Sequence, residues 1–190
     1  MTKDNTNWSE TNLPERLFVL GAGPSLELLY PFREEIDSWG HWVVQRCDIV
    51  KPFLEFIKPL YSISYWKLAK TINAGYGIQL VNPSGKKNYG ESSIGTFISH
   101  FESYSGKELL LFGYDGTGNG YWRQQVFQHK NGDGAGKDHT KKVHIEDVDN
   151  FNKLYAKNSC SETKLFHLGK TTNIHVKQLS IKEIKKLIKK

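Results

Sequence analysis

Short apolar runs alternate with helix-like patterns along most of the chain. The apolar runs cover residues 17–20, 42–47, 61–66, 77–81, 108–113 and 164–168, and several of them stop at a glycine or a polar turn. Runs of this length, bounded by turn residues, are typical of buried β-strands. Residues 92–104, 144–158 and 180–190 instead space their apolar residues as helices do. We therefore expect an α/β fold, a single Rossmann-like domain with a mainly parallel sheet flanked by helices.

The pattern also divides the chain into parts. Residues 1–15 are polar and are expected to form a flexible arm, residues 16–178 form the folded domain, and residues 179–190 form a basic amphipathic tail. Seven glycines fall in the 24 positions from Gly113 to Gly136. Loops of that length in compact domains are usually functional or disordered. Residues 114–143 are therefore expected to form a lid-like loop.

The net charge is concentrated at the end of the chain. Lys and Arg number 26 against 20 Asp and Glu, a net charge of +6, of which the last ten residues carry +4. The nearly neutral remainder argues against a broad nucleic-acid-binding surface. In the tail, Ile181, Ile184, Leu187 and Ile188 share one side of the predicted helix. Such a helix can lie on an anionic membrane, dock on its own domain or contact nucleic acid.

Several features bear on the compartment. No apolar run reaches the length of a membrane span, and the first residues are polar. Cys47 and Cys160 are too few for a disulfide scaffold and lack the spacing of a metal site. These features predict a cytoplasmic protein, with peripheral membrane contact through the tail as the alternative.

The most specific motif is a turn between the first strand and the next helix. It consists of Gly21, Ala22, Gly23, Pro24 and Ser25. Glycines allow close approach of the backbone to a ligand, and the amides that begin a helix attract phosphate. We expect these residues to bind a nucleotide phosphate. An NAD or FAD fingerprint would carry a third glycine where Leu26 stands, so a dinucleotide is disfavoured.

Two aspartates are expected at the carboxyl ends of strands, the edge at which parallel sheets bind ligands. Asp48 ends the second run, and Asp115 follows the fifth. Asp48 is a candidate to hold a ribose hydroxyl. Asp115 is a candidate to bind a ribose, a sugar hydroxyl or the Mg²⁺ of a nucleoside triphosphate.

The turn, with Leu20 before it and Leu26 after it, resembles the Gly-x-Gly-Pro-Ser-Leu signature of the bacterial family 42 sialyltransferases. The same signature occurs in the related 6-hydroxymethylpterin diphosphokinase domain. Further segments are similar to segments of these groups, namely Arg46-Cys47-Asp48, Ser92-Ser93-Ile94-Gly95 and Leu111-Phe112-Gly113-Tyr114-Asp115. The resemblance implies that Ser92, Ser93 and Gly95 contact the nucleotide.

The resemblance also implies catalytic groups. In the sialyltransferases a histidine beyond a flexible lid deprotonates the acceptor hydroxyl, and tyrosines bind the departing phosphate. Here His139 and His144 are the candidate bases, and Tyr114 and Tyr121 are the candidate phosphate ligands. Histidine suits the role of base because its unperturbed pKa of about 6.5 lies near neutral pH.

We therefore expect a glycosyltransferase that moves a sugar, for example a sialic-acid-like one, from a nucleotide-activated donor of the CMP type to the hydroxyl of a small molecule or glycan. No permanent cofactor and no metal are expected, because Asp147 and Asp149 fall in the first turns of a predicted helix, where acids favour the helix dipole. One alternative is an ATP- and Mg²⁺-dependent diphosphokinase of the hydroxymethylpterin type, with Asp115 as metal ligand. Another is a nucleotide-binding module without catalysis.

Overall fold

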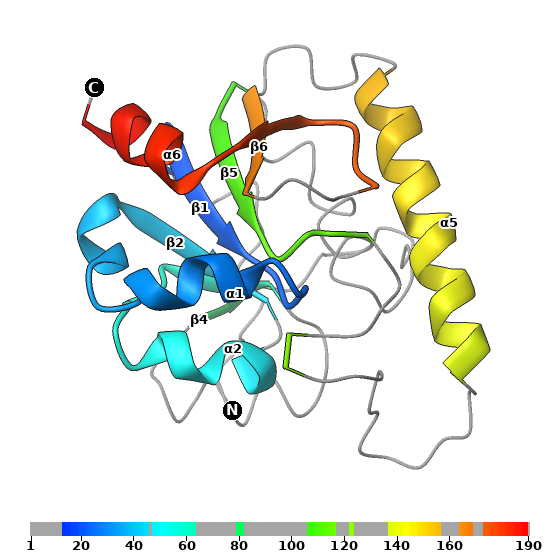
Figure 1. The fold of residues 1–190 in the computed structure, drawn as a ribbon, viewed down its shortest axis with the longest axis horizontal. Helices are drawn as coiled ribbons and strands as arrows, with labels where there is room; N and C mark the ends of the chain where they lie inside the picture. The colour runs from blue at the N-terminus through cyan, green and yellow to red at the C-terminus, as the bar shows by residue number, and fades with distance from the viewer. Residues whose placement is uncertain are drawn as a thin grey trace.

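The computed structural model describes residues 13–45, 47–63, 79–81, 106–116, 122–123, 137–156, 164–168 and 173–189 (Figure 1). The helix expected at 92–104, with Ser92, Ser93 and Gly95, lies outside the described residues. So do Tyr121, the first twelve residues of the arm and most of the lid-like loop.

A seven-stranded sheet forms the centre of the molecule, in the order β4-β3-β2-β1-β5-β6-β7. Its strands are β1 (Arg16–Leu20), β2 (His41–Val44), β3 (Tyr61–Ile63), β4 (Gln79–Val81), β5 (Glu108–Phe112), β6 (Lys164–Leu168) and β7 (Lys177–Leu179). Every neighbouring pair is parallel. The expected α/β, Rossmann-like arrangement is confirmed.

Helices cover both faces of this sheet (Figure 1). On one face lie the short α1 (Leu26–Leu29), the 3₁₀ turns η2 (Tyr30–Phe32) and η3 (Ile36–Trp39), α2 (Cys47–Leu54) and α6 (Ile181–Ile188). The long helix α5 (Lys137–Ala156) packs on the other face. Alternate residues of β1 point to opposite faces, as in any strand. Phe18 therefore belongs to the first core, and Leu17 and Val19 belong to the second.

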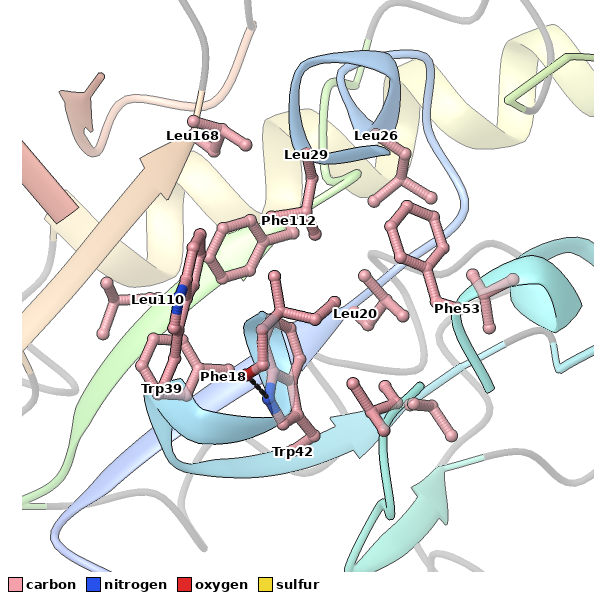
Figure 2. Packing of buried hydrophobic residues seen from close by; sticks show 14 of the residues in the cluster. Phe18, Leu20, Leu26, Leu29, Trp39, Trp42, Phe53, Leu110, Phe112 and Leu168 are labelled. Atoms are coloured by element: carbon pink, nitrogen blue, oxygen red, sulfur yellow. Dashed lines mark hydrogen bonds between the residues drawn. The ribbon is translucent and has the colours of Figure 1, made fainter. Parts of the chain in front are cut away.

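The first core is rich in aromatic rings (Figure 2). Phe18 stacks on Trp42 with their ring centroids 4.9 Å apart, and Phe112 lies 5.3 Å from Trp42. The indole nitrogen of Trp42 donates to the carbonyl of Ile36 at 2.9 Å, so this buried polar group is satisfied. Large buried rings contribute much of the burial energy of a domain this size. Phe18, Trp42 and Phe112 come from the neighbouring strands β1, β2 and β5, so the packing of these rings holds the three strands together.

Two expected boundaries are wrong. The second apolar run, residues 42–47, does not end as a strand, because β2 stops at Val44 and Cys47 begins α2. The buried residues of α2 fall in two pairs one helical turn apart, Ile49 with Val50 and Phe53 with Leu54. This helical spacing was overlooked because it directly follows the apolar run. Helix α5 begins at Lys137 rather than near His144, so residues 137–143 are helical and do not belong to a loop.

The basic tail docks on its own domain. Ser180 forms a capping box with Glu183 at the start of α6, and Ile184 is 1% exposed within the first core. Ile181, Leu187 and Ile188 pack against the same core, and the Arg16 guanidinium donates to the Leu187 carbonyl at 3.2 Å. Of the three alternatives for the tail, the structure therefore shows docking on the domain for its apolar side.

Among the helices of the described ranges, none has the length and apolar character needed to cross a membrane.

Candidate functional site

The order of the strands reverses direction beside β1. From β1 the chain builds outward through β2, β3 and β4, and then crosses back to place β5 on the opposite side of β1. In open parallel sheets ligands bind at such a switch point, outside the carboxyl ends of the strands. The turn after β1 and the segment after β5 therefore meet where a ligand is expected.

These two segments are hydrogen-bonded to each other. The amide of Gly21 donates to the carbonyl of Phe112 at 2.7 Å, and the amide of Gly23 donates to the carbonyl of Gly113 at 2.7 Å. A Cβ on Gly21 would lie 2.7 Å from the Gly113 carbonyl oxygen, and a Cβ on Gly23 would lie 2.7 Å from that same atom. The glycines of the turn are thus required for close packing against the segment after β5.

Asp115 links the two segments through its side chain. The carboxylate is 4% exposed, and its Oδ2 accepts a hydrogen bond from the backbone nitrogen of Ser25 at 2.8 Å. The Ser25 hydroxyl in turn accepts a hydrogen bond from the amide of Gly113 at 3.2 Å. Burial raises the pKa of Asp115, against the lowering effect of its hydrogen bonds to Ser25. The Ser25 amide expected to face a phosphate is therefore already engaged by Asp115.

His167 of β6, which the sequence did not single out, lies next to this carboxylate. Its Nε2 is 3.6 Å from Oδ1 of Asp115, and the residue is 1% exposed. Burial lowers the pKa of His167 to about 4, so the ring is neutral at neutral pH. The one signal in the sequence is a histidine placed among the apolar residues Leu165, Phe166 and Leu168.

Tyr114 lies in the core instead of facing the edge of the sheet. It is 1% exposed in the second core, and its hydroxyl donates to Oε1 of Gln45 at 2.6 Å. Its ring fills the space left by the missing side chain of Gly21. This placement does not support the expected role of Tyr114 as a phosphate ligand.

Residues 122–123 close the other side of the turn. Trp122 donates its backbone nitrogen to the Ala22 carbonyl at 2.7 Å and its indole nitrogen to Glu27 at 2.6 Å. The Arg123 guanidinium also donates to Glu27, and these hydrogen bonds lower the pKa of that carboxyl. The Arg123 guanidinium lies over the Tyr30 ring, 4.0 Å from the ring centroid, and the Arg123 side chain is 48% exposed. Arg123 thus places a half-exposed guanidinium, paired with Glu27, at the edge of the site.

The remaining predicted residues lie on helices. Asp48 belongs to the first turn of α2, so its expected place at the end of a strand is wrong. His139 lies in the first turn of α5, and His144 lies farther along the same helix. Figure 1 shows α5 beginning at the side of the molecule toward which the strands β1 and β5 point. An α5 residue linked to Asp115 by hydrogen bonds lies farther along the helix: Asn152 donates to the Asn173 carbonyl at 2.9 Å, and the Asn173 amide donates to the Asp115 carbonyl at 3.0 Å.

Within the described ranges, no group of three or more His, Cys, Asp or Glu side chains is placed to hold a metal ion.

Comparisons with known proteins add no assignment: no protein-family model, no curated protein and no solved structure matches the chain.

Proposed function

We propose that the protein is a glycosyltransferase that transfers a sugar from a nucleotide-activated donor, of the CMP type, to an acceptor hydroxyl without a metal ion. The observation that carries the proposal is the position of the Gly-Pro-Ser turn. It lies at the switch point of an all-parallel sheet, against the segment that ends in Asp115. Open parallel sheets bind nucleotides at this place. The resemblance of both segments to sialyltransferase motifs supplies the class of donor.

The proposed chemistry needs a base and a group that receives negative charge. A histidine of α5, His139 or His144, takes the proton of the acceptor hydroxyl, whose oxygen then attacks the anomeric carbon of the sugar. The bond from that carbon to the phosphate oxygen breaks, and the nucleotide leaves with the electron pair. Arg123, half exposed at the edge of the turn, supplies positive charge for the departing phosphate.

The environment of Asp115 favours this reaction over the diphosphokinase alternative. A carboxylate that holds Mg²⁺ must present an oxygen to the ion. Here Oδ2 is hydrogen-bonded to Ser25, and Oδ1 is buried toward His167. Binding a metal through Asp115 would require at least one of these oxygens to leave its position, whereas a metal-independent transfer leaves both in place.

A cytoplasmic setting belongs to the same proposal. It is supported by the two cysteines, which are too few to form a disulfide scaffold.

A ligand panel in a thermal unfolding assay tests the proposal. CMP and CDP are expected to raise the melting temperature equally with Mg²⁺ and with EDTA. Stabilisation by ATP that needs Mg²⁺ would instead favour the diphosphokinase, and no stabilisation by any nucleotide would contradict both enzymes.

Substitutions sharpen the same test. Arg123→Ala is expected to weaken CMP binding by about tenfold, the effect of losing one charge-assisted hydrogen bond. Arg33→Ala is the matched control, because this guanidinium also lies over the Tyr30 ring, at 4.5 Å, and also pairs with a glutamate, Glu34. Unlike Arg123, it does not follow Trp122, whose backbone nitrogen donates to the Ala22 carbonyl of the turn. Equal losses in the two variants would remove Arg123 from the site. Turnover of a CMP-sugar that persists in both His139→Ala and His144→Ala would remove the proposed base.

A further inference from the structure

Four polar side-chain atoms are buried without a hydrogen-bond partner among the described residues: Gln45 Nε2, Asp115 Oδ1, and Nδ1 and Nε2 of His167. Leaving such an atom unpaired is unfavourable, and more so for a charged group. Three of the four atoms belong to Asp115 and His167, which face each other. The cost of burying them is reduced if the two side chains satisfy one another.

The geometry brings this pairing within reach. Oδ1 of Asp115 lies 3.6 Å from Nε2 of His167, and closing that gap by about 0.6 Å gives an ordinary hydrogen bond. The other oxygen of the same carboxylate accepts the amide of Ser25 at 2.8 Å. The carboxylate therefore stands between β6 and the turn after β1. The main chain of Asp115 is held separately, because its carbonyl accepts the amide of Asn173 at 3.0 Å.

The protonation states fit a single bond between the two side chains. Burial lowers the pKa of His167 to about 4 and raises the pKa of Asp115. A neutral imidazole carries one N–H, and only the tautomer with hydrogen on Nε2 donates to a carboxylate at this position. The carboxylate then accepts one hydrogen bond on each oxygen.

Among the described residues packed around Asp115 and His167, no other charged side chain is placed to pair with either of them. From α5, Val148 and Phe151 face the core, whereas Glu146, Asp149 and Lys153 are exposed. From the segment after β6, His175 is exposed. Glu27 of α1 is exposed and pairs with Arg123. The hydroxyl of Tyr114 is bonded to Gln45.

We propose that His167 is a positioning residue of the candidate site, which holds the Asp115 carboxylate through Nε2–H so that Asp115 keeps Ser25 and the Gly-Pro-Ser turn in place. His167 itself touches no ligand and acts through Asp115. The effect of His167 on nucleotide affinity rests on the proposed function. The effect of His167 on the Ser25 amide is independent of the proposed function.

The first test reads the tautomer of His167 in the unaltered protein by ¹⁵N NMR of the imidazole at pH 7. The expected result is a neutral ring with hydrogen on Nε2. In Asp115→Asn, whose side-chain NH₂ can donate to the ring, the hydrogen is expected to move to Nδ1. A charged ring, or hydrogen on Nδ1 in the unaltered protein, overturns the proposal without any need for a variant to fold.

The second test reads the Ser25 amide in three variants. His167→Phe is expected to lower the protection of this amide from hydrogen exchange by about tenfold or more. It is also expected to raise the midpoint of the Asp115 titration seen at the Ser25 amide, because the carboxylate has lost a donor. His167→Gln restores an N–H donor and is expected to reverse both changes. His175→Gln, at an exposed histidine, is the control and is expected to change neither.

The outcomes separate the two proposals. Unchanged Ser25 protection and titration in His167→Phe overturn the positioning role. If His167→Phe does not fold, the tautomer measurement and His167→Gln decide. With CMP as the probe, affinity is expected to fall several-fold in His167→Phe and to recover in His167→Gln. If CMP does not bind the unaltered protein, the proposed function fails, while the tautomer and Ser25 results still decide the role of His167.

Discussion

The carboxylate of Asp115 accepts a hydrogen bond from the backbone nitrogen of Ser25 at 2.8 Å, across 90 residues of sequence. A side chain of the protein thus occupies the amide that a glycine-rich turn commonly offers to a phosphate. This contact joins the two central strands, β1 and β5, at their carboxyl ends. It makes the packing of the turn and the chemistry of the site depend on each other.

Gly23 is expected to tolerate no side chain. In Gly23→Ala the new Cβ would overlap Oδ2 of Asp115 and lie 2.7 Å from the Gly113 carbonyl oxygen, so the contact between the two segments must open. We expect a loss of about 2–4 kcal/mol in the free energy of unfolding, measured with urea.

Gly106→Ala is the control for that substitution. Gly106 has a φ of +75°, but no atom lies within 4 Å of the position of its Cβ. Only the backbone conformation penalises alanine there, at about 1–2 kcal/mol. A loss in Gly23→Ala no larger than in Gly106→Ala would contradict the close approach of the two segments.

Acid is expected to destabilise the fold through His167. Burial lowers the pKa of this histidine from 6.5 to about 4. As the pH falls from 6.5 toward 4, the unfolded chain takes up a proton that the folded chain does not bind. The stability due to the buried neutral ring is therefore complete above pH 6.5 and is lost toward pH 4, by up to about 3 kcal/mol.

The pKa of Asp115 is raised, so the contribution of this group has the opposite sign. The stability that Asp115 contributes is complete below the pKa of this group in the unfolded chain. It is lost as the pH rises through the pKa of the group in the folded protein. Urea unfolding at several pH values between 7 and 4.5 separates the two groups. His167→Gln should flatten the acid loss, and His175→Gln should leave it unchanged. An identical pH dependence in His167→Gln and the unaltered protein would show that His167 is not buried in its neutral form.

The docked tail predicts an asymmetric response along α6. Ile184 is 1% exposed in the first core, whereas Lys182 on the same helix is exposed. Ile184→Ala should cost about 2–4 kcal/mol of unfolding free energy, the usual cost of a cavity in a core. Lys182→Ala should stay within about 0.5 kcal/mol. Equal, small effects would mean that the tail does not dock in solution.

The cap of the same helix gives an independent check. The Ser180 hydroxyl accepts the amide of Glu183, and the Glu183 side chain accepts the amide of Ser180. Ser180→Ala should cost about 1 kcal/mol in urea unfolding. Ser38→Ala removes a different exposed hydroxyl, which donates to the Glu35 carbonyl, and it serves as the comparison. A smaller loss at Ser180 than at Ser38 would argue against the cap.

Much of the fold follows from the apolar runs, because a strand buried on both faces is apolar along its whole length. The strands β1, β5 and β6 were located in this way. The strand β7 was not, because Leu179 is the only apolar residue among its three. The start of α5 was missed because Val143 is the only apolar residue in 137–143, which leaves no periodicity to detect.

The site was predicted only in part. The glycine-rich turn and Asp115 were placed at one edge of the sheet because all parallel strands end there. Which groups satisfy one another was not predictable, since the Asp115 contact with Ser25 depends on the strand order β2-β1-β5. His167 was missed because the sequence does not show which neighbour its ring will face.

Chemical-shift mapping with CMP in the absence of divalent metal tests the central claim most directly. On titration of the ¹⁵N-labelled protein, the amides of Gly23, Ser25 and Gly113 are expected to shift with one saturating curve. The chemical shifts of the α6 amides are expected to stay unchanged. This helix ends near Arg16, at the amino end of β1, whereas the turn lies at the carboxyl end of that strand. Shifts confined to other parts of the chain, or no shifts at millimolar CMP, would contradict a nucleotide site at the switch point.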